Sequence, residues 1–186
     1  EVVRETKNLL FKQNRIYKNL ISELKKNNVI LVKPEDLSKN EKVKLKNIFS
    51  EEIYPLLTPS AIDPAHPFPF IVNQGRAVVM KLKKKNKKRL LNSIIVIPKA
   101  LSRFIEIDGG KNFKKYVIID DVISFFSSEI FPDHDLESKM IFRVIRDSDV
   151  EIQEEAEDLV RSFELALKRR RIGDIVRLEV IKNSNK

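Results

Sequence analysis

The chain has 186 residues, which suits one domain of ordinary size, and 42% of them are hydrophobic, enough for a packed core. A net charge of +9 favours polyanionic partners, namely nucleic acid, an anionic membrane or a phosphate polymer, although an AT-rich genome would also enrich lysine. The absence of cysteine excludes disulfides, thiolate metal sites and thiol catalysis.

The first quarter of the chain predicts two helices joined by a short strand. Residues 1–27 carry an apolar stripe with a spacing of three and four residues, typical of a long helix. "VILV" (29–32) predicts a strand. Ser38 and Glu41 then form a capping-box pattern that begins a second helix, expected to run to about Tyr54. Because the chain starts inside a helical pattern, we expect it to be an excised piece of a larger protein.

The next segment is a loop rich in proline. Five of the eight prolines fall within residues 55–69, and each disfavours helix in the residue before it, so we expect an extended, stiff segment. Phe68 and Phe70 are expected to anchor this loop to the core, with His66 near the surface.

The remainder predicts strands and helices in irregular alternation. The expected strands are residues 70–83, 90–98, 103–107, 116–119, 140–147 and 175–180, which are rich in Val and Ile. A helix over 122–131 would be capped by Asp120 or Asp121, and a helix over 154–171 would pack Leu159, Phe163 and Leu167 on the sheet. The pattern predicts an α+β fold with one mixed, largely antiparallel sheet and packed helices, preceded by a helical N-terminal segment. We expect that segment to span residues 1–54 and the domain core to span 55–183.

The sequence contains no self-contained active site. The four glycines form no phosphate-binding loop, and no nucleophile motif is present. The two histidines, His66 and His134, lack the spacing of metal ligands, so we expect no metal site. The alternative is a metal ion held by the carboxylates in "DPAH" (63–66) and "DHD" (133–135). No apolar run approaches the roughly 20 residues that span a bilayer, and no signal peptide is visible, so we expect a cytoplasmic protein, with a membrane-peripheral location as the alternative.

Five ordered segments resemble the polyphosphate kinases, bacterial enzymes that build polyphosphate from ATP. The proline-rich "YPLLTPSAIDPAHPFPFIVN" (54–73) carries the resemblance most clearly. The others are "QNRIYKNLISELKKNNVIL" (13–31), "VIPKALSRFIEI" (96–107), "FRVIRDSDVEI" (142–152) and "RRRIGDIVRLEV" (169–180). Ile145 and Ser148 depart from the Thr and Ala that are usual in the family.

The resemblance implies that this chain is the head, or middle, domain of such an enzyme. In the family, the histidine phosphorylated by ATP and most contacts to ATP and Mg²⁺ belong to the C-terminal half. We therefore expect no catalytic residue and no cofactor in this chain, which alone should be inactive. Polyphosphate and ATP would be partners of the full-length enzyme. The resemblance also implies a homodimer formed through this domain, so a purely structural dimerisation module is the alternative function. Specific nucleic-acid binding lacks a recognition helix or a stacking motif.

Three strand arginines are the candidates for binding polyphosphate: Arg143, Arg146 and Arg177. Phosphoryl transfer depends on positioning and charge neutralisation, and the polymer carries about one negative charge per phosphate. Alternation predicts that Arg177 and Glu179 share one strand face, that Arg146 lies with Phe142 and Val144, and that Arg143 lies on the other face. The alternative is pairing of Arg177 with a neighbouring acid and of Arg146 with Asp147 or Asp149. The basic runs at 81–89 and 168–171 are a solvated hairpin tip and a helix end, or else guides for polyanions.

Overall fold

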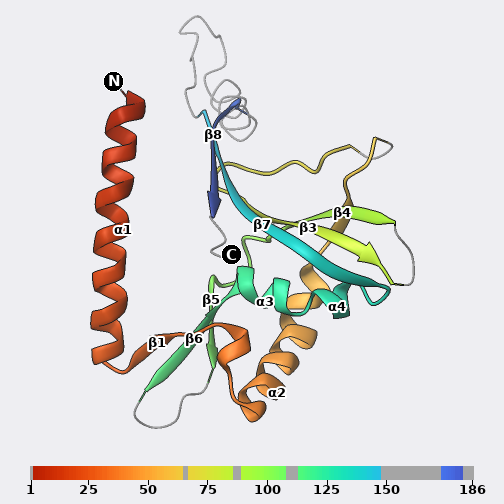
Figure 1. Ribbon diagram of the computed structural model, residues 1–186, viewed down its shortest axis with the longest axis horizontal. Coiled ribbons are helices and arrows are strands. Elements are labelled where there is room, and N and C mark those ends of the chain that lie inside the picture. The colour runs from red at the N-terminus through yellow and green to blue at the C-terminus, as the bar shows by residue number, and fades with distance from the viewer. Residues whose placement is uncertain (1, 65–66, 86–88, 108–112, 148–172, 182–186) are drawn as a thin grey trace, which may run out of the picture. The chain divides into compact units, whose positions relative to one another are not determined.

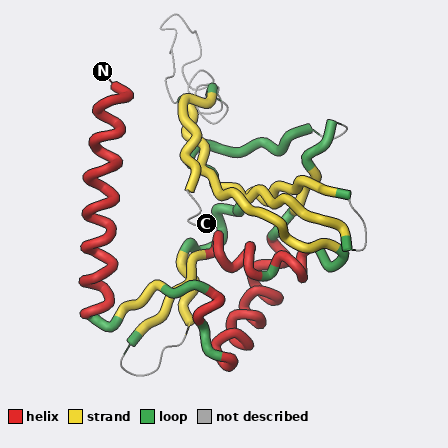
Figure 2. Tube along the Cα trace, viewed as in Figure 1, coloured by secondary structure: helices red, strands yellow, loops and turns green. Residues whose placement is uncertain are grey.

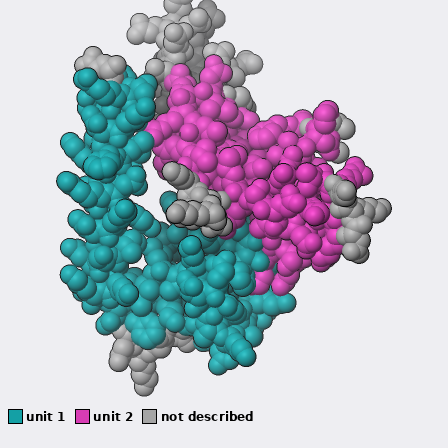
Figure 3. Space-filling view, in the orientation of Figure 1, with its two compact units in different colours: residues 1–51, 102–125 teal, residues 52–101, 126–186 magenta. Residues whose placement is uncertain are grey.

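The computed structural model describes residues 2–64, 67–85, 89–107, 113–147 and 173–181, which form helices and two sheets (Figures 1 and 2). The chain forms two compact units (Figure 3). Unit 1 comprises residues 1–51 and 102–125, and unit 2 comprises residues 52–101 and 126–186. The expected α+β class and N-terminal helix are confirmed, but the strands divide between two sheets rather than one. The expected boundary between residues 54 and 55 stays a prediction.

Unit 1 begins with the long helix α1, Val2–Lys26. Asn28, with φ of 62°, ends the helical path in the left-handed conformation that suits asparagine after a helix, and β1 (Val29–Leu31) follows. β1 pairs in parallel with β6 (Lys114–Ile118), which pairs antiparallel with β5 (Phe104–Ile107). This gives a three-stranded mixed sheet.

Two further helices complete unit 1. A 3₁₀ turn over Pro34–Asp36 precedes α2 (Lys39–Ile48), which begins at the predicted capping box. α3 (Ile119–Phe125) starts directly after β6, so Asp120 lies inside the helix and is buried rather than capping it. That part of the prediction is wrong, because the turn from strand to helix comes earlier than expected. The buried hydrophobic residues of unit 1 are Leu37, Leu45, Phe49, Ile107, Val117, Ile119, Val122 and Ile123.

Unit 2 is built on a five-stranded antiparallel sheet with the order β2-β4-β3-β7-β8. The strands are β2 (Pro59–Ala61), β3 (Arg76–Lys84), β4 (Leu90–Val96), β7 (His134–Arg146) and β8 (Ile175–Ile181). A π-helical turn over Phe49–Ile53 and a 3₁₀ turn over Tyr54–Leu56 lead into β2, and the short helix α4 (Ser127–Ile130) contacts β7. The predicted helix over 154–171 lies outside the described residues.

The core of unit 2 lies on both faces of its central strands. One face carries a buried cluster made of Ile71, Ala77, Ile94, Phe142 and Val144. The opposite face of β3 buries Val78, Met80 and Leu82. Central strands covered on both faces become nearly continuous in apolar residues, which explains why "AVVM" and "SIIVI" were readable as strands.

The proline-rich loop reaches the core of this sheet through Ile71 rather than through its phenylalanines. Ile71 is buried in the cluster, whereas Phe68 and Phe70 are 61% and 51% exposed. The prediction that the two aromatic residues anchor the loop is therefore wrong. Pro67 and Pro69 flank Phe68, and Pro69 precedes Phe70, so residues 67–70 form no regular structure. Ile71, which follows them, is the residue that packs in the core of the sheet. His66 lies outside the described residues.

Candidate polyanion-binding surface

The last two strands of unit 2, β7 and β8, bring two of the three predicted arginines together. Arg143 lies on β7 and Arg177 on β8, and the antiparallel register pairs Arg143 with Glu179 and Ile145 with Arg177. Directly opposite residues share a face of an antiparallel sheet, so all four side chains point to the same side. Alternation predicted that Arg177 shares a face with Glu179 and that Arg143 shares one with Ile145, and the pairing of the two strands places both pairs on the same side.

Glu179 is shared between the two guanidinium groups. Arg143 Nε donates to Glu179 Oε2 at 2.8 Å, and its Nη2 also contacts this oxygen. Arg177 Nη2 lies 3.2 Å from the other carboxylate oxygen, Oε1. The side chains of Arg143 and Arg177 are 41% and 31% exposed. Two positive charges therefore meet one negative charge at a solvent-accessible surface, and the cluster keeps a formal charge of +1.

A third arginine lies in the same row, and the sequence analysis did not single it out. Arg76, at the start of β3, is the direct cross-strand neighbour of Arg143. The three positions Arg76, Arg143 and Glu179 thus follow one another across β3, β7 and β8. Strand periodicity alone could not find Arg76, because its relation to Arg143 depends on the pairing of strands far apart in the chain.

Arg146 is placed differently and serves as a link between segments. Its Nε donates to the carbonyl of Ile71 at 2.8 Å, its Nη1 donates to the carbonyl of Gly173 at 2.9 Å, and its guanidinium lies 4.5 Å from the ring centroid of Phe70. These contacts join the proline-rich loop, the end of β7 and the approach to β8. A role of Arg146 in binding phosphate stays a prediction, and Asp149 lies outside the described residues.

The chain just after β7 and the chain just before β8 approach closely beside this link. The backbone N–H of Asp147 donates to the carbonyl of Asp174 at 2.8 Å. A Cβ atom on Gly173 would lie 2.2 Å from the carbonyl oxygen of Asp147, so any other residue would force the two backbones apart. Glycine is therefore required here by space.

Two lysines of the basic run at 81–89 make local contacts. Lys81 Nζ lies 3.7 Å from Glu137, and Lys85 Nζ donates to the carbonyl of Pro132 at 2.8 Å. Residues 86–88 and the second run, 168–171, lie outside the described residues. Within the described part of the chain, no three carboxylate or imidazole groups gather as a metal site would require. Nor does any described helix combine the length and apolarity needed to cross a membrane.

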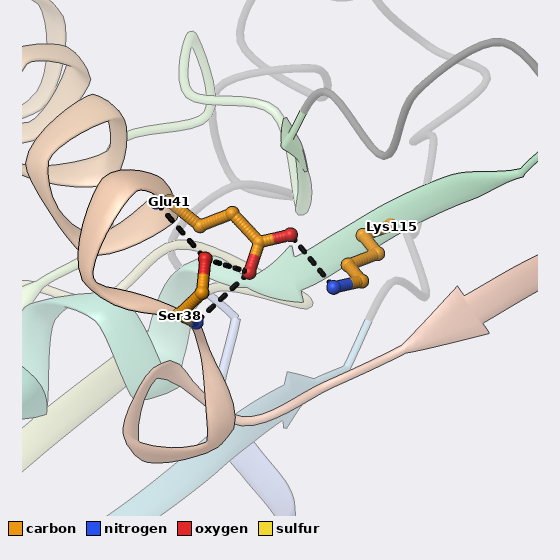
Figure 4. A network of polar contacts seen from close by, with 3 residues as sticks. All are labelled: Ser38, Glu41 and Lys115. Carbon is orange, nitrogen blue, oxygen red and sulfur yellow. Dashed lines mark hydrogen bonds and ion pairs between the residues drawn. The ribbon is translucent and has the colours of Figure 1, made fainter.

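A second charged cluster, in unit 1, surrounds the N-terminus of α2 (Figure 4). Glu41 accepts hydrogen bonds from Ser38 N at 2.9 Å, Ser38 Oγ at 2.8 Å and Lys115 Nζ at 2.6 Å. The hydrogen bond from Lys115, followed by those from Ser38, lowers the pKa of Glu41 from 4.5 to about 2. One carboxylate balances one ammonium, and the cluster fastens α2 to β6.

Comparison with known proteins identifies the group to which this chain is similar. The sequence model described as the polyphosphate kinase middle domain matches residues 40–186. A polyphosphate kinase of Erythrobacter litoralis is 42% identical over 179 residues, which cover 96% of this chain and 24% of that protein. A polyphosphate kinase of Streptomyces coelicolor is 35% identical over 167 residues, covering 88% and 22% respectively.

A solved structure shows the same fold. The crystal structure of polyphosphate kinase from Porphyromonas gingivalis matches with a TM-score of 0.65 and 23% identity, over 76% of this chain and 24% of that one. The present chain thus spans about a quarter of the length of the relatives it matches. The chain belongs to the polyphosphate kinase family, and it contains the family's middle domain.

Proposed function

We propose that this chain is the middle domain of an enzyme that transfers the terminal phosphate of ATP to a growing polyphosphate chain, and that its β7–β8 surface borders the path of the polymer. Family membership and the names of the relatives support the reaction. In this proposal ATP and Mg²⁺ bind the rest of a cytoplasmic, homodimeric enzyme, and the present chain supplies no catalytic group.

The observation that carries the proposed surface is the sharing of Glu179 by two arginines. A guanidinium already paired one-to-one with a carboxylate gains little from a phosphate, because it must first give up its partner. Here Arg143 and Arg177 contribute two charges against one, and both are partly exposed. Guanidinium groups present planar, bidentate donors that match phosphate oxygens. Such a surface can bind the polymer while Glu179 keeps the two side chains oriented.

The proposal is tested by titrating the chain with polyphosphate at low and high salt. The double variant Arg143→Gln with Arg177→Gln should bind at least about tenfold more weakly at low salt, because two charge-assisted contacts are lost. The deficit should shrink at high salt, where screening weakens all such contacts. The variant Lys12→Gln with Lys18→Gln is the matched control, since it removes the same charge from exposed positions on α1.

Equal affinity of the double variant and the control would contradict a role in the polymer path. The remaining candidate would then be the purely structural one, in which the domain dimerises without touching substrate. The exposed apolar edge strand β8 is the observation that favours this second role.

A further inference from the structure

β8 carries two charged groups of the proposed β7–β8 surface, Arg177 and Glu179, and burial does little to fix its register. Its side chains Val176, Leu178 and Val180 are each half exposed or more. Successive side chains of a strand alternate, so a slip of one residue would turn Arg177 and Glu179 to the opposite face of the sheet. Burial opposes such a slip strongly only where one face of the strand is covered. Among the described residues, another interaction is therefore needed to hold β8 in register with β7.

The register is also interrupted at the start of β8. Ile145 pairs with Arg177 and Arg146 pairs with Ile175, so Val176 is an extra residue without a partner on β7. A bulge of this kind disrupts the ladder of hydrogen bonds and bends the strand. Because the bulge lies directly before Arg177, contacts that fix the chain ahead of it set the position of Arg177 along β7.

The side chain of Arg146 makes such a contact. Its Nη1 donates to the carbonyl of Gly173, two residues before β8, and its Nε donates to the carbonyl of Ile71, which is buried in the core cluster. The backbone N–H of Arg146 donates to the side chain of Asn73 at 2.9 Å. One guanidinium thus ties the approach to β8 to a segment that the core holds in place.

The shape of a guanidinium suits this task. It is planar, and its separate N–H groups can bond two carbonyls while its face stacks on an aromatic ring. Arg146 does both, since its guanidinium also lies 4.5 Å from the ring centroid of Phe70. A lysine would keep the positive charge, but its single ammonium cannot reproduce the stack together with two hydrogen bonds from separate nitrogen atoms. Replacing Arg146 by lysine therefore separates the geometry of the side chain from its charge.

We propose that Arg146 is a positioning residue, which holds β8 in the register that places Arg177 and Glu179 beside Arg143. This inference deepens the proposed function and rests on it, because it names a residue that shapes the polymer-binding surface without being part of it. The polymer would contact Arg143 and Arg177, and Arg146 would act on binding through the position of β8.

The register can be read with a pair of cysteines, since the natural chain has none. Val144 and Leu178 lie directly opposite each other, on the face away from the charged cluster and within the separation that a disulfide spans. Val144→Cys with Leu178→Cys should therefore form an internal disulfide under mild oxidation. Adding Arg146→Lys should slow this reaction several-fold, because a slipped strand separates the two thiols. Adding Arg15→Lys, at an exposed position on α1, is the matched control and should leave the rate unchanged.

The same disulfide tests whether Arg146 acts through the register. In the reduced state, the triple variant that adds Arg146→Lys should bind polyphosphate about tenfold more weakly than the cysteine pair alone, although the two chains carry the same charge. In the oxidised state the disulfide holds the register in place of Arg146, so the two affinities should agree within about twofold. A residue that itself bound phosphate would behave differently, because a disulfide on the other face cannot replace a lost contact to the polymer.

Two results would overturn the proposal. One is disulfide formation at an equal rate with and without Arg146→Lys. The other is a loss of affinity that persists in the oxidised triple variant while circular dichroism shows it folded. If the reduced triple variant does not fold, the affinity of this oxidised form decides. Slower disulfide formation, together with unchanged polyphosphate binding by Arg143→Gln with Arg177→Gln, would support the register role and count against the proposed polymer path.

Discussion

Each of the two charged clusters of this protein is built around one glutamate that binds basic side chains, but the two clusters differ in net charge. In unit 1, Glu41 accepts hydrogen bonds from Lys115 and from Ser38, the N-cap of α2, so one carboxylate meets one ammonium. In unit 2, Glu179 forms ion pairs with both Arg143 and Arg177, so one carboxylate meets two guanidinium groups. The first cluster is neutral and largely covered, with Glu41 14% exposed, whereas the second is positive and open.

This difference is our reason for treating the first cluster as a structural ion pair and for proposing the second as a binding surface. A neutral, covered cluster has no charge left for a ligand, and its contribution is to stability. In a cluster with more positive than negative groups, one positive charge is not neutralised, and a polyanion can neutralise it. The sign and amount of surplus charge, rather than the number of basic residues nearby, is what marks the β7–β8 surface.

The largest stability effect is expected from Glu41→Ala. This change removes the capping box and leaves the partly buried Lys115 without its carboxylate, so the free energy of unfolding should fall by about 2–3 kcal/mol. Urea denaturation measures the loss. Glu23→Ala, at an exposed position on α1, is the control and should change little. If the two variants unfold at the same midpoint, the unit 1 cluster is not the stabilising one.

Acid should weaken the same cluster in a defined pH window. The pKa of Glu41 is lower in the folded chain than the ordinary value of 4.5, so its contribution is complete above about pH 4.5 and is lost as the pH falls towards 2. Glu41→Gln removes this titration. The difference in unfolding free energy between the natural chain and Glu41→Gln should therefore shrink between those two pH values. A constant difference, measured by urea denaturation at several pH values, would argue against the role of Lys115.

The smallest stability effect is expected from Arg177→Ala. Arg177 is partly exposed, and Glu179 keeps Arg143, so the unfolding free energy should change by less than about 0.5 kcal/mol. Thermal or urea denaturation measures this change, and polyphosphate titration of the same sample should show weaker binding. Should Arg177→Ala unfold the domain, the open cluster would be structural and the contrast with unit 1 would disappear.

Local chemistry made some of these features predictable. The capping box of Ser38 and Glu41 lies within four residues, and strand alternation placed Arg177 beside Glu179. Lys115, the third member of the unit 1 cluster, lies 74 residues from Glu41, and no local pattern connects them. The same applies to Arg76, which meets Arg143 only through strand pairing.

Other features could not be predicted from the sequence because they depend on which strands become neighbours in a sheet. Division of the strands between two sheets follows from long-range pairing, which periodicity does not encode. Alternation also could not show that Val176, Leu178 and Val180 are exposed on β8, which lies at an edge of its sheet. The predicted packing of Leu159, Phe163 and Leu167 lies outside the described residues and stays a prediction.

Pro59 protects one edge of the five-stranded sheet from pairing with a further strand. A sheet with two open edges can add copies at both, and strand pairing of that kind continues into fibres. The β2 edge of this sheet is short and begins with a residue that has no N–H, so among the described strands β8 is the edge left to extend. A sheet that can extend at one edge alone cannot add copies indefinitely, so Pro59 opposes the growth of fibres from this domain.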